Sequence, residues 1–199
     1  GDIGVGECIE DCTNAPLSTA IDLGTGRTAV AIDTGSSHAC AILDNGSLIC
    51  WGRDARGQLG NGEPSGSAYN LNAPSTPIDL GAGRTAVEVA CGGEHTCVIL
   101  DNGDMKCWGK GEFGRNGNGE RSEDIGSPPS DTIDLGTNRT AIATCASSYA
   151  HSCAILDNGS LKCWGYNYYG QLGDGIGRGN NGGPGDEPID FGTGRTVVA

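Results

Sequence analysis

Aromatic and basic side chains are both scarce in this 199-residue sequence. Aromatic residues make up 5% of it and apolar residues 36%, and no run of about 18 apolar residues could span a bilayer. Lys and Arg number 12 against 25 Asp and Glu, which gives a formal net charge of −13. Because phosphate contacts depend on clustered Lys and Arg, we expect no nucleic acid partner, no anionic membrane surface and no membrane span.

The beginning of the chain lacks the features of a secretory leader. Its first ten residues, GDIGVGECIE, contain no basic flank, no apolar block and no initiator Met. We therefore expect a mature product or a fragment of a longer protein. The sequence also has no nucleophile elbow, no Gly-rich phosphate loop and no zincin helix motif. We predict a protein that is not an enzyme and that binds no cofactor.

Internal repetition is the dominant positive feature. The stretch HACAILDNGSLICWG at residues 38–52 returns almost unchanged at residues 95–109 and 151–165. A second box, IDLGTGRTA in its first copy, starts at residues 21, 78, 133 and 189, a period of 55 to 57 residues. Such a period predicts a repeat architecture in which each unit packs on its neighbours. The 36 glycines stand at fixed places in each unit, so they predict turns and not disorder.

Each unit carries the signals of four short strands. In the first unit, strands are expected at residues 27–32, 38–43 and 48–51, with a hairpin turn at residues 44–46. A fourth strand is expected around the GQLG box at residues 57–60. Four antiparallel strands with a Trp-Gly at a fixed place are typical of a β-propeller blade. We therefore predict an all-β fold made of β-propeller blades.

The Asp-Asn-Gly turn determines which cysteines face each other. A three-residue loop with a left-handed glycine pairs Leu43 with Ser47. That register sets Cys40 opposite Cys50, whereas a two-residue loop would pair Cys40 with Trp51. Directly opposed residues lie within disulfide reach, and a spacing of ten residues suits a hairpin bridge better than a zinc site. We predict no metal site and three bridges: Cys40–Cys50, Cys97–Cys107 and Cys153–Cys163.

The same register sorts the other side chains of the hairpin onto two faces. Ile42 and Leu48 share the disulfide face, and Met105 takes the equivalent place in the second repeat. Lys106 and Lys162 occupy one repeat position on the opposite face. We therefore expect that opposite face to be the more exposed to water.

Four further cysteines stand outside the hairpins: Cys8, Cys12, Cys91 and Cys145. One arrangement pairs Cys8 with Cys12 and Cys91 with Cys145. In another, Cys8 or Cys12 reaches a different blade or a different subunit. The sequence leaves both open, and we expect all four to be bonded. Ten cysteines in recurring pairs indicate an oxidising compartment, so we predict an extracellular or cell-surface protein.

The three histidines, His38, His95 and His151, occupy one repeat position. Because a catalytic group seldom appears in triplicate, we predict histidines held by backbone hydrogen bonds and no catalytic residue. Glu88, Glu94 and Tyr149 are unique to single repeats but form no recognisable catalytic set.

The segment at residues 173–187 is rich in Asp, Asn and Gly, which offer oxygen ligands to calcium. It lacks the spacing of an EF-hand, so we favour a solvated loop.

N-glycosylation sequons occur at Asn45, Asn138 and Asn158. Asn45 and Asn158 lie at hairpin tips, which are accessible. Asn102 lies at the same tip but is followed by Gly103 and Asp104, so it lacks the required hydroxyl residue. We predict glycans on the first three and none on Asn102.

These boxes resemble the regulator of chromosome condensation repeat family. The resemblance rests on the Gly-x-x-His element, the Asp-Asn-Gly turn, the CWG box and the GQLG box, and it covers nearly all of residues 16–199. It implies a propeller, typically of about seven blades. The nuclear founder of the family loads a small GTPase and docks on chromatin, roles not expected of an acidic chain with paired cysteines. The chain is more similar to secreted, cysteine-containing repeats of microbial and algal surface proteins.

Counted in strands, the chain amounts to three and a half blades in a single repeat domain. Residues 1–20 are expected to end a preceding blade, residues 21–77, 78–132 and 133–188 to form three repeats, and residues 189–199 to begin a further blade. Because an open arc exposes sheet edges, we predict a partial propeller or one completed by oligomerisation.

The function expected from these features is structural. We predict a non-enzymatic extracellular protein that serves as the building block of a surface layer or filament. Its expected partners are copies of itself, neighbouring repeats of the same protein, or glycans. The alternative is a ligand- or protein-binding propeller module that belongs to a longer secreted protein.

Overall fold

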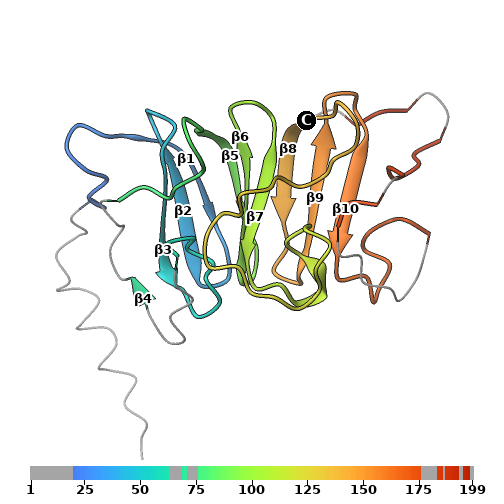
Figure 1. The fold of residues 1–199 in the computed structure, drawn as a ribbon, viewed down its shortest axis with the longest axis horizontal. Helices are drawn as coiled ribbons and strands as arrows, with labels where there is room; N and C mark the ends of the chain where they lie inside the picture. Colours follow the sequence, from blue (N-terminus) through green and yellow to red (C-terminus); the bar gives the residue numbers. More distant parts are fainter. Residues whose placement is uncertain are drawn as a thin grey trace, which may run out of the picture.

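Three antiparallel β-sheets stand side by side in chain order in the computed structural model (Figure 1). The structure describes residues 20–62, 69–70, 76–175, 183–185, 187–192 and 195–197. The segment expected to end a preceding blade, with Cys8 and Cys12, lies outside the described residues, as does much of the loop considered for calcium. Within the described part, no helix has the length and hydrophobicity that crossing a bilayer requires.

Each sheet is one propeller blade. Blade 1 has the strand order β1 (Ala29–Thr34), β2 (His38–Leu43), β3 (Leu48–Arg53) and β4 (Tyr69–Asn70). Blade 2 contains β5 (Ala86–Cys91), β6 (His95–Leu100) and β7 (Met105–Gly109), followed by a short 3₁₀ turn, η1 (Glu112–Gly114). Blade 3 contains β8 (Ala141–Ala146), β9 (His151–Leu156) and β10 (Leu161–Gly165). The predicted all-β propeller repeats are confirmed.

The hairpin between the second and third strand of each blade has the predicted three-residue turn. In blade 1 the Leu43 N–H donates to the Ser47 carbonyl at 2.8 Å, and Gly46 has a φ of 76°. This register places Cys40 directly opposite Cys50. The structure contains the three hairpin bridges, each with Cα atoms 4.1 Å apart.

The predicted fourth strand at the GQLG box is wrong. Residues 57–60 form a tight turn in which Gly57 and Gly60 have φ values of 78° and 77°, a left-handed conformation that an extended strand does not allow. The turn buries Leu59, whose N–H donates to an Asp54 carboxylate oxygen at 3.0 Å. The fourth strand of blade 1 is instead β4, which pairs with β3. In blade 2 its place is taken by a single bridge between Gly109 and Ile125.

The expectation of a wet face opposite the disulfides is also wrong, because neighbouring structure covers that face. Lys106 and Lys162 are buried despite their charge. The Lys106 ammonium donates to the Leu80 carbonyl at 3.0 Å, and that of Lys162 donates to the Gly185 carbonyl at 2.8 Å. Burial of the aliphatic stem is therefore combined with a hydrogen bond for the charged end.

The disulfide face of each blade packs against the tryptophan face of the next. Between blades 1 and 2, the Cys40–Cys50 bridge joins one buried cluster with Val98 and Trp108. Between blades 2 and 3, the equivalent cluster contains the Cys97–Cys107 bridge and Trp164. Both indole rings are fully buried. The core of the arc therefore lies between the blades.

A hydrogen-bond relay accompanies this packing. The Gln58 carbonyl in the GQLG turn of blade 1 accepts from Trp108 Nε1 at 3.1 Å and from Thr96 Oγ1 at 2.8 Å, both in blade 2. Thr96 Oγ1 in turn lies 2.9 Å from His38 Nε2. In the next interface, the Arg115 carbonyl receives the equivalent bonds from blade 3, at 3.0 Å and 3.2 Å. A side-chain hydroxyl contacts the ring of His38 and that of His95, where a backbone group was expected.

Cys91 and Cys145 are free thiols, so the pairing considered between them is wrong, as is the expectation that all four extra cysteines are bonded. The two cysteines do not occupy the same repeat position. Cys145 lies opposite Cys153, and the residue of blade 2 at that position is Ala90. Cys91 comes one residue later and lies opposite Thr96. Successive side chains of a strand point to opposite faces. Cys91 is therefore buried against blade 1, and Cys145 is exposed. Burial raises the pKa of the Cys91 thiol well above its ordinary value.

Candidate protein-binding surface

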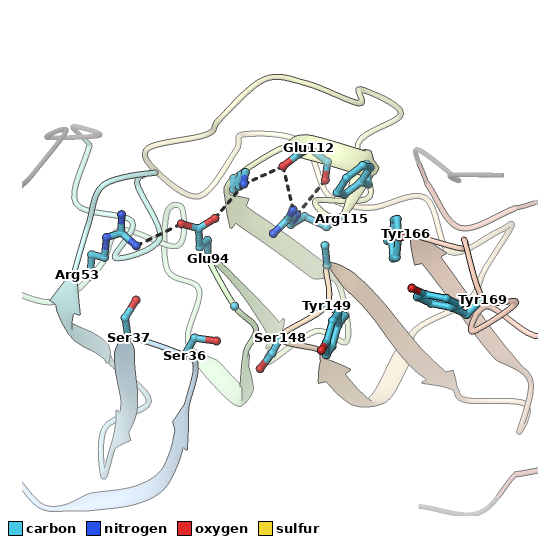
Figure 2. Close-up of a pocket in the computed structure, with 14 residues that line it drawn as sticks. Ser36, Ser37, Arg53, Glu94, Glu112, Arg115, Ser148, Tyr149, Tyr166 and Tyr169 are labelled. Carbon is cyan, nitrogen blue, oxygen red and sulfur yellow. Dashed lines mark hydrogen bonds and ion pairs between the residues drawn. The ribbon is translucent and has the colours of Figure 1, made fainter. Parts of the chain in front are cut away.

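A groove of about 640 Å³ crosses one end of the three blades. It lies where the turns between the first and second strands meet the residues that follow the third strands (Figure 2). We call it the tyrosine groove and define it by its lining residues, which are Ser36, Ser37, Arg53, Gly93, Glu94, Lys110, Glu112, Phe113, Arg115, Ser148, Tyr149, Ala150, Tyr166 and Tyr169. All three blades contribute to it.

A row of alternating charges lines the part of the groove formed by blades 1 and 2. Arg53 lies 3.5 Å from one oxygen of Glu94, and Lys110 lies 3.0 Å from the other. Lys110 also contacts Glu112 at 2.8 Å, and Arg115 extends the row from Glu112 at 3.7 Å. Figure 2 shows Arg53, Glu94 and Arg115 following one another along this row. Three cations and two carboxylates thus gather at one place in a strongly acidic chain.

These contacts hold the groups in their charged forms. The hydrogen bond to Glu112 raises the pKa of Lys110. The hydrogen bond from Lys110 lowers the pKa of Glu112. Burial works to raise the pKa of Glu94, but the hydrogen bond and the charge of Lys110 outweigh it, so that pKa lies below its ordinary value. Because most of the row is partly exposed, it contributes little to stability, and its main effect is to orient side chains.

Aromatic rings form the blade 3 side of the groove, where Figure 2 places Tyr149, Tyr166 and Tyr169. The Tyr166 ring centroid lies 4.8 Å from that of Phe113 and 6.4 Å from that of Tyr169. Tyr168 and Tyr169 meet edge to face at 5.0 Å. Tyr149 and Tyr169 are nevertheless 74% and 79% exposed. The cluster therefore presents large amphipathic rings to the solvent.

Two residues of the groove have strained backbones. Phe113 and Ala150 have φ values of 68° and 70°, a region that side chains other than glycine rarely adopt. Such strain concentrates at functional sites, where the surrounding structure holds it in place. The groove thus combines exposed rings, oriented charges and fixed backbone.

The residues singled out in the sequence lie in different places. Glu94 and Tyr149, unique to single repeats, both line the groove. Glu88 does not line it and instead accepts a hydrogen bond from the Thr144 N–H at 2.9 Å, across the interface between blades 2 and 3. The aspartates of the IDLG-type boxes cap loops; Asp79, for example, accepts from the Gly81 N–H at 2.9 Å.

The three sequon asparagines lie away from the groove. Asn45 and Asn158 are exposed at hairpin tips, at the strand ends opposite those that carry the groove, and Asn138 is exposed as well. The Asn45 side-chain oxygen accepts from the Ser47 N–H at 3.1 Å. The Asn102 tip has the same geometry, with Asp104 in place of the serine.

The sequence alone did not single out the other groove residues. One shared repeat position, directly after the Trp-Gly box, is occupied by Arg53, Lys110 and Tyr166, so the residue type differs from repeat to repeat. The sequence signal for these groove residues is this variability, which occurs directly after the constant Trp-Gly. A variable position beside an invariant box predicts a surface that differs between blades.

Two family models match the chain, both described as Regulator of chromosome condensation (RCC1) repeat. One matches residues 29–58, 86–119 and 142–171, and the other matches residues 45–99. Together they cover more than half of the chain, including the three hairpins and their bridges.

Several curated proteins are similar in sequence. The ultraviolet-B receptor UVR8 of Arabidopsis thaliana is 31% identical over 130 residues, which is 65% of this chain and 28% of the receptor. The RCC2 homolog of Danio rerio is 33% identical over 129 residues, or 64% of this chain and 24% of that protein. The chain thus spans less than a third of the length of either relative.

Solved structures share the fold. Prp20p from Saccharomyces cerevisiae has a TM-score of 0.70 at 19% identity, with 81% of this chain and 38% of that chain covered. Human WBSCR16 has a TM-score of 0.65 at 23% identity, with 82% of this chain and 38% of that chain covered. From its three matched repeats and the propeller blades that they form, this chain belongs to the regulator of chromosome condensation (RCC1) repeat family.

Proposed function

We propose that this chain is a non-enzymatic protein-binding propeller module and that a partner protein docks in the tyrosine groove. The observation that carries the proposal is the exposure of Tyr149 and Tyr169 beside the oriented charge row. Tyrosine and arginine are enriched among the residues that dominate protein–protein binding energy. A tyrosine ring offers a large contact area together with a hydroxyl that can remain hydrogen-bonded.

The relatives support a protein as the partner. One crystal structure contains yeast RCC1 (Prp20) bound to Kap60, and another concerns the binding of Prp20p to Gsp1p and histones. Those partners belong to the yeast protein. For this chain, the net charge of −13 argues against nucleic acid, and the mixed charges of the groove suit a polar protein surface.

We also propose that the protein works outside the cell or at its surface. The support is the set of three hairpin bridges, since such bonds persist in oxidising compartments and are rare in the cytosol.

A second candidate function is assembly with further blades, from copies of this chain or from neighbouring repeats, into a surface layer or filament. The supporting observation concerns the disulfide face of blade 3. Cys40 and Cys50 are fully buried under the following blade, whereas Cys153 and Cys163 are only partly buried among the described residues. That face carries the same residue types that are covered in blades 1 and 2, so a further blade would bury it.

Replacing Tyr169 or Tyr149 with alanine is expected to weaken partner binding by about tenfold or more for each substitution, because truncating a central aromatic residue typically costs over 1 kcal/mol. A photo-crosslinking residue at position 149 would first identify the partner in material from the native source. Calorimetric titration of that partner would then give the affinities. Val87→Ala serves as the matched control, since Val87 is 58% exposed but lies outside the groove. Equal affinities for the wild type and both tyrosine variants would refute docking in the groove.

If the protein passes through a eukaryotic secretory pathway, Asn45, Asn138 and Asn158 are expected to carry glycans and Asn102 to remain bare. Intact glycopeptide mass spectrometry measures the occupancy of each site. Asp104→Ser creates a sequon at Asn102 on the same kind of tip, and we expect it to add a fourth glycan. Bare Asn45 and Asn158 in secreted material would contradict the prediction.

A further inference from the structure

Three sulfur atoms and an imidazole meet between blades 1 and 2. A ring nitrogen of His38, Cys40 Sγ and Cys91 Sγ all lie within 4.8 Å of one another, and the three residues are buried. Cys50, bonded to Cys40, supplies the third sulfur atom. The set spans the interface, because Cys91 is the last residue of β5 in blade 2 and the others belong to β2 and β3 in blade 1.

The hydrogen bonds of His38 leave one ring nitrogen available for a ligand. Thr96 Oγ1 donates its proton to the Gln58 carbonyl at 2.8 Å, so it can only accept from His38 Nε2, 2.9 Å away. The proton of the neutral ring is therefore on Nε2, and Nδ1 carries a lone pair. His38 is 4% exposed, and its Nδ1 is buried with no hydrogen-bond partner. A histidine that donates one N–H to a fixed acceptor while its other nitrogen is unpaired has the arrangement of a metal ligand.

Asp33 of blade 1 holds Cys91 in place through two contacts. Its backbone N–H donates to an Asp33 carboxylate oxygen at 2.6 Å, and its Sγ lies 3.6 Å from the Asp33 carbonyl. Strand pairing within blade 2 fixes it from the other side, opposite Thr96. The thiol is thus positioned beside the bridge by both blades.

From this juxtaposition we propose that reduction of the Cys40–Cys50 bridge converts the cluster into a zinc site, with His38 Nδ1 and the sulfurs of Cys40, Cys50 and Cys91 as ligands. A two-electron reductant of the dithiol class breaks the S–S bond, becomes a disulfide itself, and leaves a proton on each of the two released sulfurs. Zn²⁺ then displaces the protons of three thiols, and three protons are released to solvent. Three cysteines and one histidine are a tetrahedral ligand set typical of structural zinc.

The sulfur atoms of Cys40 and Cys50 are either bonded to each other or bound to zinc, so the redox state of the surroundings selects between the two states. In the bridged state, Cys91 of blade 2 contacts blade 1 through packing and through its hydrogen bonds to Asp33. In the zinc state it is bonded to blade 1 through the metal. The proposal departs from the sequence-based expectation of no metal site, which rested on the ten-residue spacing and did not include Cys91.

The neighbouring interface offers a built-in comparison. His95 and the Cys97–Cys107 bridge repeat the blade 1 arrangement there, and His95 Nδ1 is also buried without a partner. The residue of blade 3 that is equivalent to Cys91, however, is Ala146. It lies opposite Ser152, as Cys91 lies opposite Thr96 in blade 2. The second interface therefore lacks only the third sulfur.

The test is titration of the phosphine-reduced protein with Co²⁺, whose absorption reports tetrahedral thiolate ligation, followed by displacement with Zn²⁺. We expect one tight equivalent in the wild type and none in the oxidised protein. Cys91→Ala should weaken binding by more than about 100-fold, since even loss of an outer-shell partner costs 10- to 100-fold. Cys145→Ala, which removes the second free thiol among the described residues, should leave the tight equivalent unchanged. Ala146→Cys should add a second equivalent.

Tight cobalt binding that survives Cys91→Ala would overturn the proposal, as would a reduced wild-type protein that gives no tetrahedral spectrum. Circular dichroism of oxidised Cys91→Ala checks that this variant folds with its bridges intact. If reduction alone unfolds the chain, stoichiometric zinc must restore the sheet signal in the wild type and not in Cys91→Ala; failure to do so also refutes the site. None of these results bears on docking in the tyrosine groove.

Discussion

Replacing Trp108 with alanine is expected to lower the free energy of unfolding by about 3–5 kcal/mol, the range for removing a fully buried aromatic side chain. The substitution leaves a cavity between blades 1 and 2, in the cluster that contains the Cys40–Cys50 bridge. It also removes the indole N–H that donates to the Gln58 carbonyl at 3.1 Å. Denaturant unfolding followed by circular dichroism measures the loss as a lower midpoint at an unchanged slope.

Trp51 provides the matched control, because it occupies the same repeat position in blade 1 but is only partly buried and packs on a smaller cluster. Trp51→Ala is therefore expected to cost less than half as much. Equal losses for Trp51→Ala and Trp108→Ala would mean that packing between the blades is not the main source of stability.

Acidification is expected to destabilise the fold between pH 6.5 and pH 4, before most carboxylates are protonated. Burial lowers the pKa of His38 from 6.5 to about 4 and that of His95 from 6.5 to about 3. Both folded-state pKa values lie below the unfolded value, so the unfolded chain binds protons first. The stabilisation is complete above pH 6.5 and is lost as the pH falls toward 4 and then 3. At about 1.4 kcal/mol per pH unit for each group, the loss at pH 4.5 amounts to several kcal/mol.

His95→Gln isolates this effect, because glutamine retains an N–H donor but does not titrate. The variant is expected to be less stable at pH 7.5, where it loses the packing of the ring. Its stability should nevertheless fall less steeply with acid than that of the wild type. Chemical unfolding at half-unit steps from pH 7.5 to 4.5 gives both slopes, and identical slopes would rule out His95 as a source of the acid sensitivity.

The hairpins could be predicted from sequence because their determinants are local. The turn glycine fixes the loop length, the loop length fixes the register, and the register places Cys40 opposite Cys50. Each link depends on residues within one hairpin.

Features that depend on a neighbouring blade could not be read in the same way. The lysine position looked solvent-facing in an isolated hairpin, yet Lys106 is covered and satisfied by the Leu80 carbonyl. The GQLG box looked like a strand, but its glycines are needed where the turn meets the next tryptophan: a Cβ on Gly60 would lie 2.6 Å from Trp108 Nε1. The candidate site could not be predicted from sequence for a related reason. It is lined by residues of three different blades, such as Arg53, Glu94 and Tyr149, which come together only in the folded arc.

The relay through the GQLG turn has a direction, and that direction matters for engineering. The acceptor carbonyl of Gln58 belongs to one repeat, and its donors, Thr96 and Trp108, belong to the repeat that follows. A chimera joined in the loop after a GQLG turn would separate the acceptor from both donors, and one joined in the next hairpin tip would still separate it from the tryptophan. A splice between a third strand and the GQLG turn that follows it would keep each acceptor and both of its donors on one parental segment. Crossover points there should therefore yield more folded hybrids than crossover points in the connecting loops or in the hairpin tips.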